Sequence, residues 1–190
     1  MRFQKILILV SLIVAAAATL YSWIFCSGVF AQIAQVLTGA PEVKKLHDAA
    51  QDFTNLFQIL GIVFILCIVL LYITACNSRR NYYITNYVAI GIAVVYMLVY
   101  AILLIVNLVN VSSILASTDL SGAKAAYDLA HYDETLFGAF QTTSWTVYIG
   151  YALFAIVIID AALIGLNLLW KIKLMQGEKE LLNNSVAEVA

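Results

Sequence analysis

Asp160 is the residue whose type fits its surroundings least well. It lies in the segment IVIIDAALIG, with an apolar stretch on each side that is long enough to place it near the middle of a membrane-spanning helix. An aspartate at the centre of such a helix costs roughly 2.5–3.5 kcal/mol on insertion scales. A cost of that size must be offset by a hydrogen-bonding partner. The sequence therefore predicts that Asp160 faces the interior of a helix bundle.

Depth along the neighbouring apolar segment suggests the partner. The segment 87–109 is centred near Leu98, so Tyr96 and Tyr100 would lie at the level of Asp160. Small and polar residues recur there at helical spacing, which is typical of a face that packs against protein: Asn86, Ala89, Ala93, Tyr96, Tyr100, Leu103 and Asn107. The matching face of the last apolar segment would carry Leu153, Ile156, Asp160, Ile164 and Asn167. We expect Asp160 to form a hydrogen bond with Tyr96 or Tyr100.

Two interpretations of this cluster remain open. A carboxyl group beside tyrosines, extended by Asn107 and Asn167, is the type of group that relays protons or cations across membranes. The same residues could instead form a polar clasp that fixes the register of the helices. The sequence has no second intramembrane acid and no intramembrane Lys, Arg or His, and it lacks the broken helices typical of transporters.

Asp128, His131 and Glu134 form a second, weaker candidate site. Their spacing of three places them on one helical face, and carboxylates at that spacing from a histidine occur in metal-binding bundles. A solvated acidic helix with an incidental histidine has the same sequence. The pattern thus indicates a weak candidate metal site and predicts no bound metal.

No other pattern indicates chemistry. The sequence has no glycine-rich phosphate loop, no Gly-x-Ser-x-Gly and no His-Glu-x-x-His. Both histidines lie outside the apolar segments, which argues against a haem or a serine or cysteine nucleophile there. The net charge of −1 gives no basic excess for nucleic acid. We expect neither an enzyme nor a cofactor.

The elements that position these residues follow from composition. Of the 190 residues, 64% are hydrophobic and 11% are charged, whereas soluble domains have about 45–50% apolar and about 25% charged residues. Four apolar segments, about 6–25, 57–76, 87–109 and 148–170, are each long enough to cross ~30 Å of hydrocarbon. The sequence predicts an all-α membrane protein, a bundle of four antiparallel transmembrane helices within residues 1–176.

Basic residues predict the orientation. Seven lie on the side of the two termini (Arg2, Lys5, Arg79, Arg80, Lys171, Lys173 and Lys179), and three lie on the other (Lys44, Lys45 and Lys124). Cytoplasmic loops are enriched in Lys and Arg. We therefore expect both termini in the cytoplasm and predict a multi-pass protein of the plasma membrane.

The segments between the spans carry helical patterns of their own. Apolar residues follow Pro41 at spacings of three and four, so a helix should begin at this proline and lead into the second span. We expect two helical hairpins extended on the outer side, within loops 26–56 and 110–147, with Gly138 interrupting the second hairpin before the last span. Residues 177–190 would form a cytoplasmic tail, frayed or disordered.

Two classes of function remain. One is a non-enzymatic accessory or scaffold subunit that assembles through its hairpins, as a homo-oligomer or with another membrane protein. Small-residue faces such as Ser11, Ala15, Ala18 and Ser22 could serve contacts between protomers. The other is a small oligomeric channel or transporter for cations or protons that uses Asp160. The sequence lacks the residues that define tetraspanins, claudins and small multidrug transporters, and we claim no resemblance to them.

Overall fold

The chain forms four long α-helices. The computed structural model describes residues 2–25, 41–76, 83–118 and 134–187. The helices are α1 (Arg2–Phe25), α3 (Pro41–Cys76), α4 (Tyr83–Ser117) and α6 (Glu134–Ala187). Each contains a segment long and apolar enough to cross a bilayer. The predicted all-α class is confirmed.

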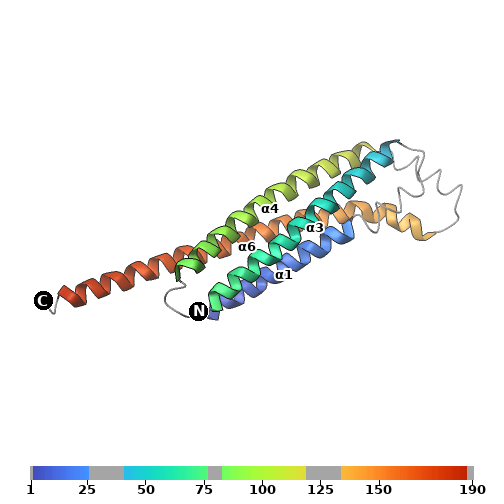
Figure 1. Cartoon of the computed structure of the whole chain (residues 1–190). Coiled ribbons are helices and arrows are strands. Elements are labelled where there is room, and N and C mark those ends of the chain that lie inside the picture. The colour runs from blue at the N-terminus through green and yellow to red at the C-terminus, as the bar shows by residue number, and fades with distance from the viewer. Residues whose placement is uncertain (1, 26–40, 77–82, 119–133, 188–190) are drawn as a thin grey trace.

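The helices pack side by side as an antiparallel bundle (Figure 1). α3 packs against α1 and α4, and α6 packs against α4 and also against α1, which closes the ring. Successive helices run in opposite directions, so the start of α1 and the end of α3 lie at the same end of the bundle. The predicted four-helix antiparallel arrangement is confirmed.

α3 and α4 are longer than a membrane requires. α3 has 36 residues and α4 has 35, which at ~1.5 Å per residue exceeds ~30 Å of hydrocarbon by about 20 Å. α3 begins at Pro41, as the sequence predicted, and its charged residues all lie before Phe53. Residues 41–53 of α3 run beside the last turns of α4 (Figure 1), and this part of α3 lies beyond the end of α1 except at Phe53, which packs on Phe25. We call this pair of segments the stalk.

The prediction that Gly138 interrupts the last helix is wrong. α6 is continuous for 54 residues, from Glu134 to Ala187, and passes through both Gly138 and Gly177. A glycine inside a helix costs only about 1 kcal/mol relative to alanine, and only a proline would remove a hydrogen bond as well. The predicted tail is therefore helical as far as Ala187, and α6 extends past the ends of the other helices (Figure 1).

Small residues let α1 approach its neighbours closely. Ser11, Ala15, Ala18 and Ser22 are all 0% exposed. This face is therefore used inside the chain and is not left over for contacts between protomers. Side chains of this size allow helix backbones to approach closely in lipid, where van der Waals packing drives association.

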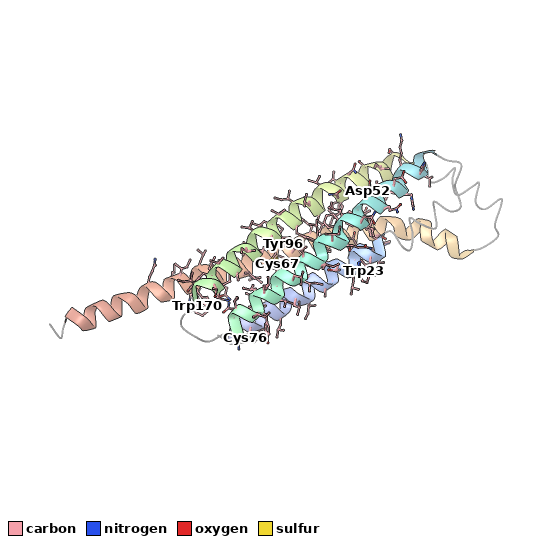
Figure 2. The ribbon with its side chains drawn as sticks, in the orientation of Figure 1. Trp23, Asp52, Cys67, Cys76, Tyr96 and Trp170 are labelled. Atoms are coloured by element: carbon pink, nitrogen blue, oxygen red, sulfur yellow. The ribbon has the colours of Figure 1, made fainter. Side chains whose placement is uncertain are left out.

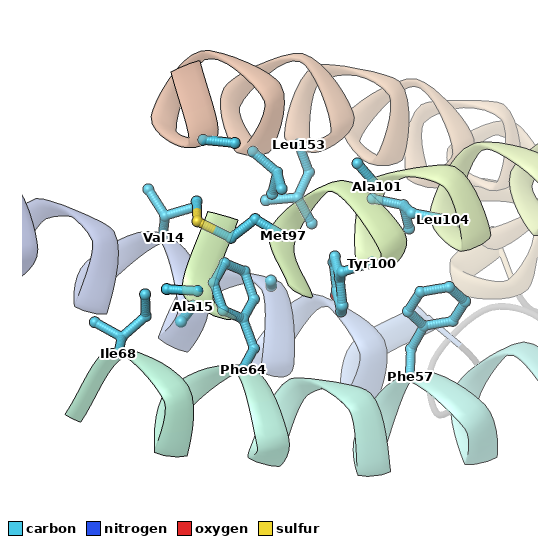
Figure 3. Packing of buried hydrophobic residues seen from close by; sticks show 14 of the residues in the cluster. Val14, Ala15, Phe57, Phe64, Ile68, Met97, Tyr100, Ala101, Leu104 and Leu153 are labelled. Atoms are coloured by element: carbon cyan, nitrogen blue, oxygen red, sulfur yellow. The ribbon is translucent and has the colours of Figure 1, made fainter. Parts of the chain in front are cut away.

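Aromatic rings fill the interior where α1, α3 and α4 meet. The Phe25 and Phe53 rings pack in a tilted arrangement with centroids 4.2 Å apart, and Phe53 stacks on Phe57 at 4.5 Å. Tyr100 of α4 then lies between Phe57 and Phe64, at 5.4 and 5.2 Å (Figure 3). The series continues from the stalk side to the middle of the bundle. Aromatic pairs in such geometries add stability beyond the area that they bury.

Two glycines give a matched test of this packing. A Cβ atom on Gly61 would lie 3.1 Å from the Thr19 Cα atom, so the α1 backbone would have to move, whereas a Cβ on Gly91 would meet nothing within 4 Å. We expect Gly61→Ala to destabilise the bundle by about 1–3 kcal/mol. Gly91→Ala should be neutral or stabilising by up to about 1 kcal/mol. Unfolding by a denaturing detergent in micelles measures both, and equal effects would contradict the α1–α3 contact.

Candidate functional site

Asp160 lies inside the bundle, as predicted, but its partner is different. Its side chain is 3% exposed. The Ser11 hydroxyl of α1 donates to Asp160 Oδ1 at 2.8 Å and also lies 3.1 Å from the Leu7 carbonyl of its own helix. The carboxyl group thus connects α6 to α1. The prediction of a hydrogen bond to Tyr96 or Tyr100 is wrong.

The two tyrosines face α3 instead of α6. The Tyr96 hydroxyl donates to the Leu60 carbonyl of α3. Tyr100 packs its ring against Phe57 and Phe64, which also belong to α3. α4 contacts both α3 and α6, and the polar stripe that the sequence assigned to the α6 contact is turned toward α3 at these two positions.

Some buried polar atoms of the bundle have no hydrogen-bond partner. Within the described part of the chain they are Asp160 Oδ2, the Tyr100 hydroxyl and Thr54 Oγ1. An unpaired buried oxygen costs about 1–3 kcal/mol, and Asp160 Oδ2 is such an oxygen on an intramembrane carboxyl group. Asp160 and Ser11 form a polar clasp with one free acceptor.

The other predicted relay residues are not joined to this clasp. Asn107 is half-buried, and its amide donates to the Leu103 carbonyl of its own helix at 2.9 Å. Asn167 is buried at 7% exposure, and no hydrogen bond of its side chain is found among the described residues. Ile156 was expected on the packed face of α6 but is 47% exposed, and Val157 is buried in its place. The predicted set thus forms no continuous hydrogen-bonded path.

A second polar cluster, which sequence reasoning missed, lies near the end of the bundle that holds the N-terminus. It takes one side chain from each helix, and we call it the polar node: Gln4, Thr74, Asn86 and Lys171. Asn86 Oδ1 accepts from Gln4 Nε2 at 3.1 Å and from Lys171 Nζ at 2.6 Å. Asn86 Nδ2 donates to Thr74 Oγ1 at 3.0 Å. A single buried amide therefore joins all four helices.

In the node, the positively charged Lys171 ammonium donates to an uncharged acceptor, the Asn86 amide oxygen. Lys171 is half-buried, and its ammonium also lies 6.0 Å from the centroid of the Tyr87 ring. In the described side chains the recorded ion pair, His47 with Asp48, belongs to the stalk. The sequence analysis placed Asn86 in the polar stripe and counted Lys171 only among the basic residues. Both residues lie near the ends of their spans on the same side of the membrane, and this shared depth was the signal that could have indicated the node.

The candidate metal residues lie at the start of α6 and before it in the sequence. Asp128 and His131 lie outside the described residues, and Glu134 is the first residue of α6, where the backbone alone is described. Elsewhere in the described ranges no three His, Cys, Asp or Glu side chains come together.

The side chains on the outer surface of the bundle indicate that lipid surrounds it. Large apolar side chains face outward on all four helices, among them Ile13, Ile59, Val95 and Leu166, each more than 60% exposed. Soluble monomers rarely expose contiguous apolar patches above a few hundred Å². Trp23 lies toward the stalk end and Trp170 toward the node end (Figure 2), both largely exposed, as in an aromatic belt.

The chain is therefore a multi-pass integral membrane protein with four spanning helices. Comparison with protein-family models, with curated proteins and with solved structures found no match.

Proposed function

We propose that this protein is a non-enzymatic scaffold or accessory subunit of a membrane complex, and that its stalk binds the partner. The observation that carries the proposal is the length of α3 and α4, which continue together for several turns beyond what a bilayer needs. A packed extension of this kind offers a rigid surface outside the lipid. The partner is a second copy of this chain or another membrane protein.

The stalk has the two faces that such a role requires. Val43, Leu46, Ala50 and Phe53 are buried, so one face of α3 holds the stalk together. Lys44, Lys45, Asp48 and Asp52 are exposed on the other face. Mixed charges of this kind give specificity and speed of association more than raw affinity. A partner with the complementary pattern would bind in one register.

A charge swap on the stalk tests this function. In Lys44→Glu/Lys45→Glu/Asp48→Lys/Asp52→Lys the net charge is unchanged but the pattern is inverted. We expect a complex purified from native membranes to fall to the mass of one chain in this variant. The control, Lys44→Arg/Lys45→Arg/Asp48→Glu/Asp52→Glu, should keep the complex. Loss of the complex in both variants, or in neither, would contradict a role for the stalk charges.

The orientation belongs to the same proposal. With both termini in the cytoplasm of a plasma-membrane protein, the stalk projects to the outside, consistent with the excess of Lys and Arg on the side of the termini. Single cysteines at Gln51 and at Gln176 test it. Both positions are exposed. A membrane-impermeant thiol reagent added to intact cells should label the first and spare the second.

A second candidate function is proton or cation passage through Asp160. The observation in its favour is the buried Oδ2 atom without a partner. Against it, the tyrosines and asparagines expected to continue the path bond elsewhere or to nothing. Flux into proteoliposomes separates the two functions. Background-level flux, equal in wild type and Asp160→Asn, removes the transport reading and leaves the scaffold.

A further inference from the structure

The Lys171 ammonium is held in place without an anionic partner. An ammonium has three N–H donors, and Asn86 Oδ1 takes one of them at 2.6 Å. Across the side chains that the structure describes, no carboxylate lies within ion-pair distance of Lys171. The residue lies two positions before the end of the candidate span Trp145–Lys173, and lipid headgroups lie at the ends of a membrane-spanning helix. Two donors thus remain for an anion at headgroup depth.

Two glycines lie deeper in the membrane on the same two helices. Gly91 follows Asn86 by five residues on α4, and Gly165 precedes Lys171 by six on α6. Because α4 and α6 are antiparallel and the Asn86–Lys171 bond sets their register, both glycines lie ~8–9 Å inward of that bond. Both are half-exposed, and a Cβ atom on either would meet nothing within 4 Å. Tyr87, one turn from Gly91, lies near Lys171, so this side of α4 is turned toward α6.

We propose that an anionic phospholipid binds at this place. Its phosphate accepts hydrogen bonds from the Lys171 ammonium, and one acyl chain lies over Gly91 and Gly165. Charge complementarity selects the occupant, since a half-buried cation at headgroup depth attracts an anionic lipid and gains less from a zwitterionic one. The node contributes by fixing the ammonium in advance, which lowers the entropy lost on binding. This site is independent of the stalk and of Asp160.

Trp170, adjacent to Lys171 and largely exposed, serves as the reporter. In a Trp23→Phe/Trp145→Phe background it is the only tryptophan of the chain. Brominated lipids quench tryptophan fluorescence on contact. In phosphatidylcholine vesicles, we expect brominated phosphatidylglycerol to quench Trp170 at about fivefold lower mole fraction than brominated phosphatidylcholine, the preference of one lysine near an anionic surface.

Three variants decide the outcome. Lys171→Gln should abolish the preference for phosphatidylglycerol, whereas Lys173→Gln, which removes an exposed charge of the same sign, should keep it. Gly91→Leu/Gly165→Leu, which leaves the node intact, should weaken quenching by phosphatidylglycerol. Equal losses in Lys171→Gln and Lys173→Gln would overturn the site in favour of surface charge. Wild-type quenching in the double leucine variant would also overturn it. Recovery of Trp170 fluorescence on addition of millimolar inorganic phosphate would show that the site binds phosphate without a lipid chain, which contradicts a lipid site.

Discussion

Replacing Ser11 by alanine is expected to destabilise the bundle by about 1–2 kcal/mol, and this cost is expected to vanish when Asp160 is leucine. In the wild type the Ser11 hydroxyl is the recorded hydrogen-bond partner of the Asp160 carboxyl group. Alanine at position 11 leaves both carboxyl oxygens buried and unpaired, which costs the desolvation of a polar group. With leucine at position 160, the loss of the Ser11 hydroxyl leaves no carboxyl oxygen unpaired, and replacing both members of such a pair can be nearly neutral.

A double-mutant cycle measures this coupling, with unfolding by a denaturing detergent in micelles as the readout. Ser22→Ala is the matched control. Ser22 lies on the same face of α1 and is equally buried, but its hydroxyl donates to the Thr19 carbonyl of its own helix. Ser22→Ala should therefore cost less than Ser11→Ala and should be additive with Asp160→Leu. If Ser11→Ala and Ser22→Ala behave alike in both backgrounds, the clasp between α1 and α6 is refuted.

The same cycle bears on function. Asp160→Asn keeps an acceptor for the Ser11 hydroxyl, so it should retain near wild-type stability. A carboxyl group that serves only as a clasp can be replaced in this way without loss of complex assembly. A carboxyl group that carries protons cannot be replaced by an amide without loss of flux, because an amide does not take up and release a proton. Stability and flux in this one variant therefore distinguish the two roles of Asp160.

The four spans and the inward position of Asp160 could be predicted from the sequence because both follow from transfer energetics. A long apolar helix is stable in lipid whatever the order of its residues, and an isolated acid within it must turn away from lipid. Helical periodicity also identified most of the packed faces. None of these arguments depends on which helix lies next to which.

The partner of Asp160 could not be predicted because that depends on neighbour order and on depth. α6 touches both α4 and α1, and periodicity does not choose between them. The depth argument centred each span in the membrane. α1, however, begins at Arg2 and not near Ile6, and its Ser11 reaches the level of Asp160. The polar node was missed for a similar reason, since Gln4 and Lys171 lie at the edges of spans whose ends the sequence defines poorly.

The node leads to the second large effect. Asn86→Leu is expected to destabilise the bundle by about 2–4 kcal/mol, more than any other single substitution considered for this chain. Leucine removes the acceptor of Gln4 and of the Lys171 ammonium together with the donor to Thr74. Each buried group left unpaired costs about 1–3 kcal/mol, and charged groups cost more. Part of this is recovered because Lys171 can extend its side chain toward the interface.

Asn107→Leu is the matched control for this substitution. Asn107 lies on the same helix and is also an amide, but it donates within α4 to the Leu103 carbonyl, so its loss should cost less than about 1 kcal/mol. Asn86→Asp should be more stable than Asn86→Leu at neutral pH, since a carboxylate still accepts from both Gln4 and Lys171 and supplies the negative charge that the ammonium lacks, although it no longer donates to Thr74. Unfolding in micelles ranks the three variants. An Asn86→Leu protein as stable as Asn107→Leu would mean that the amide does not hold the four helices together, and packing of the aromatic interior would then be the main determinant of their register.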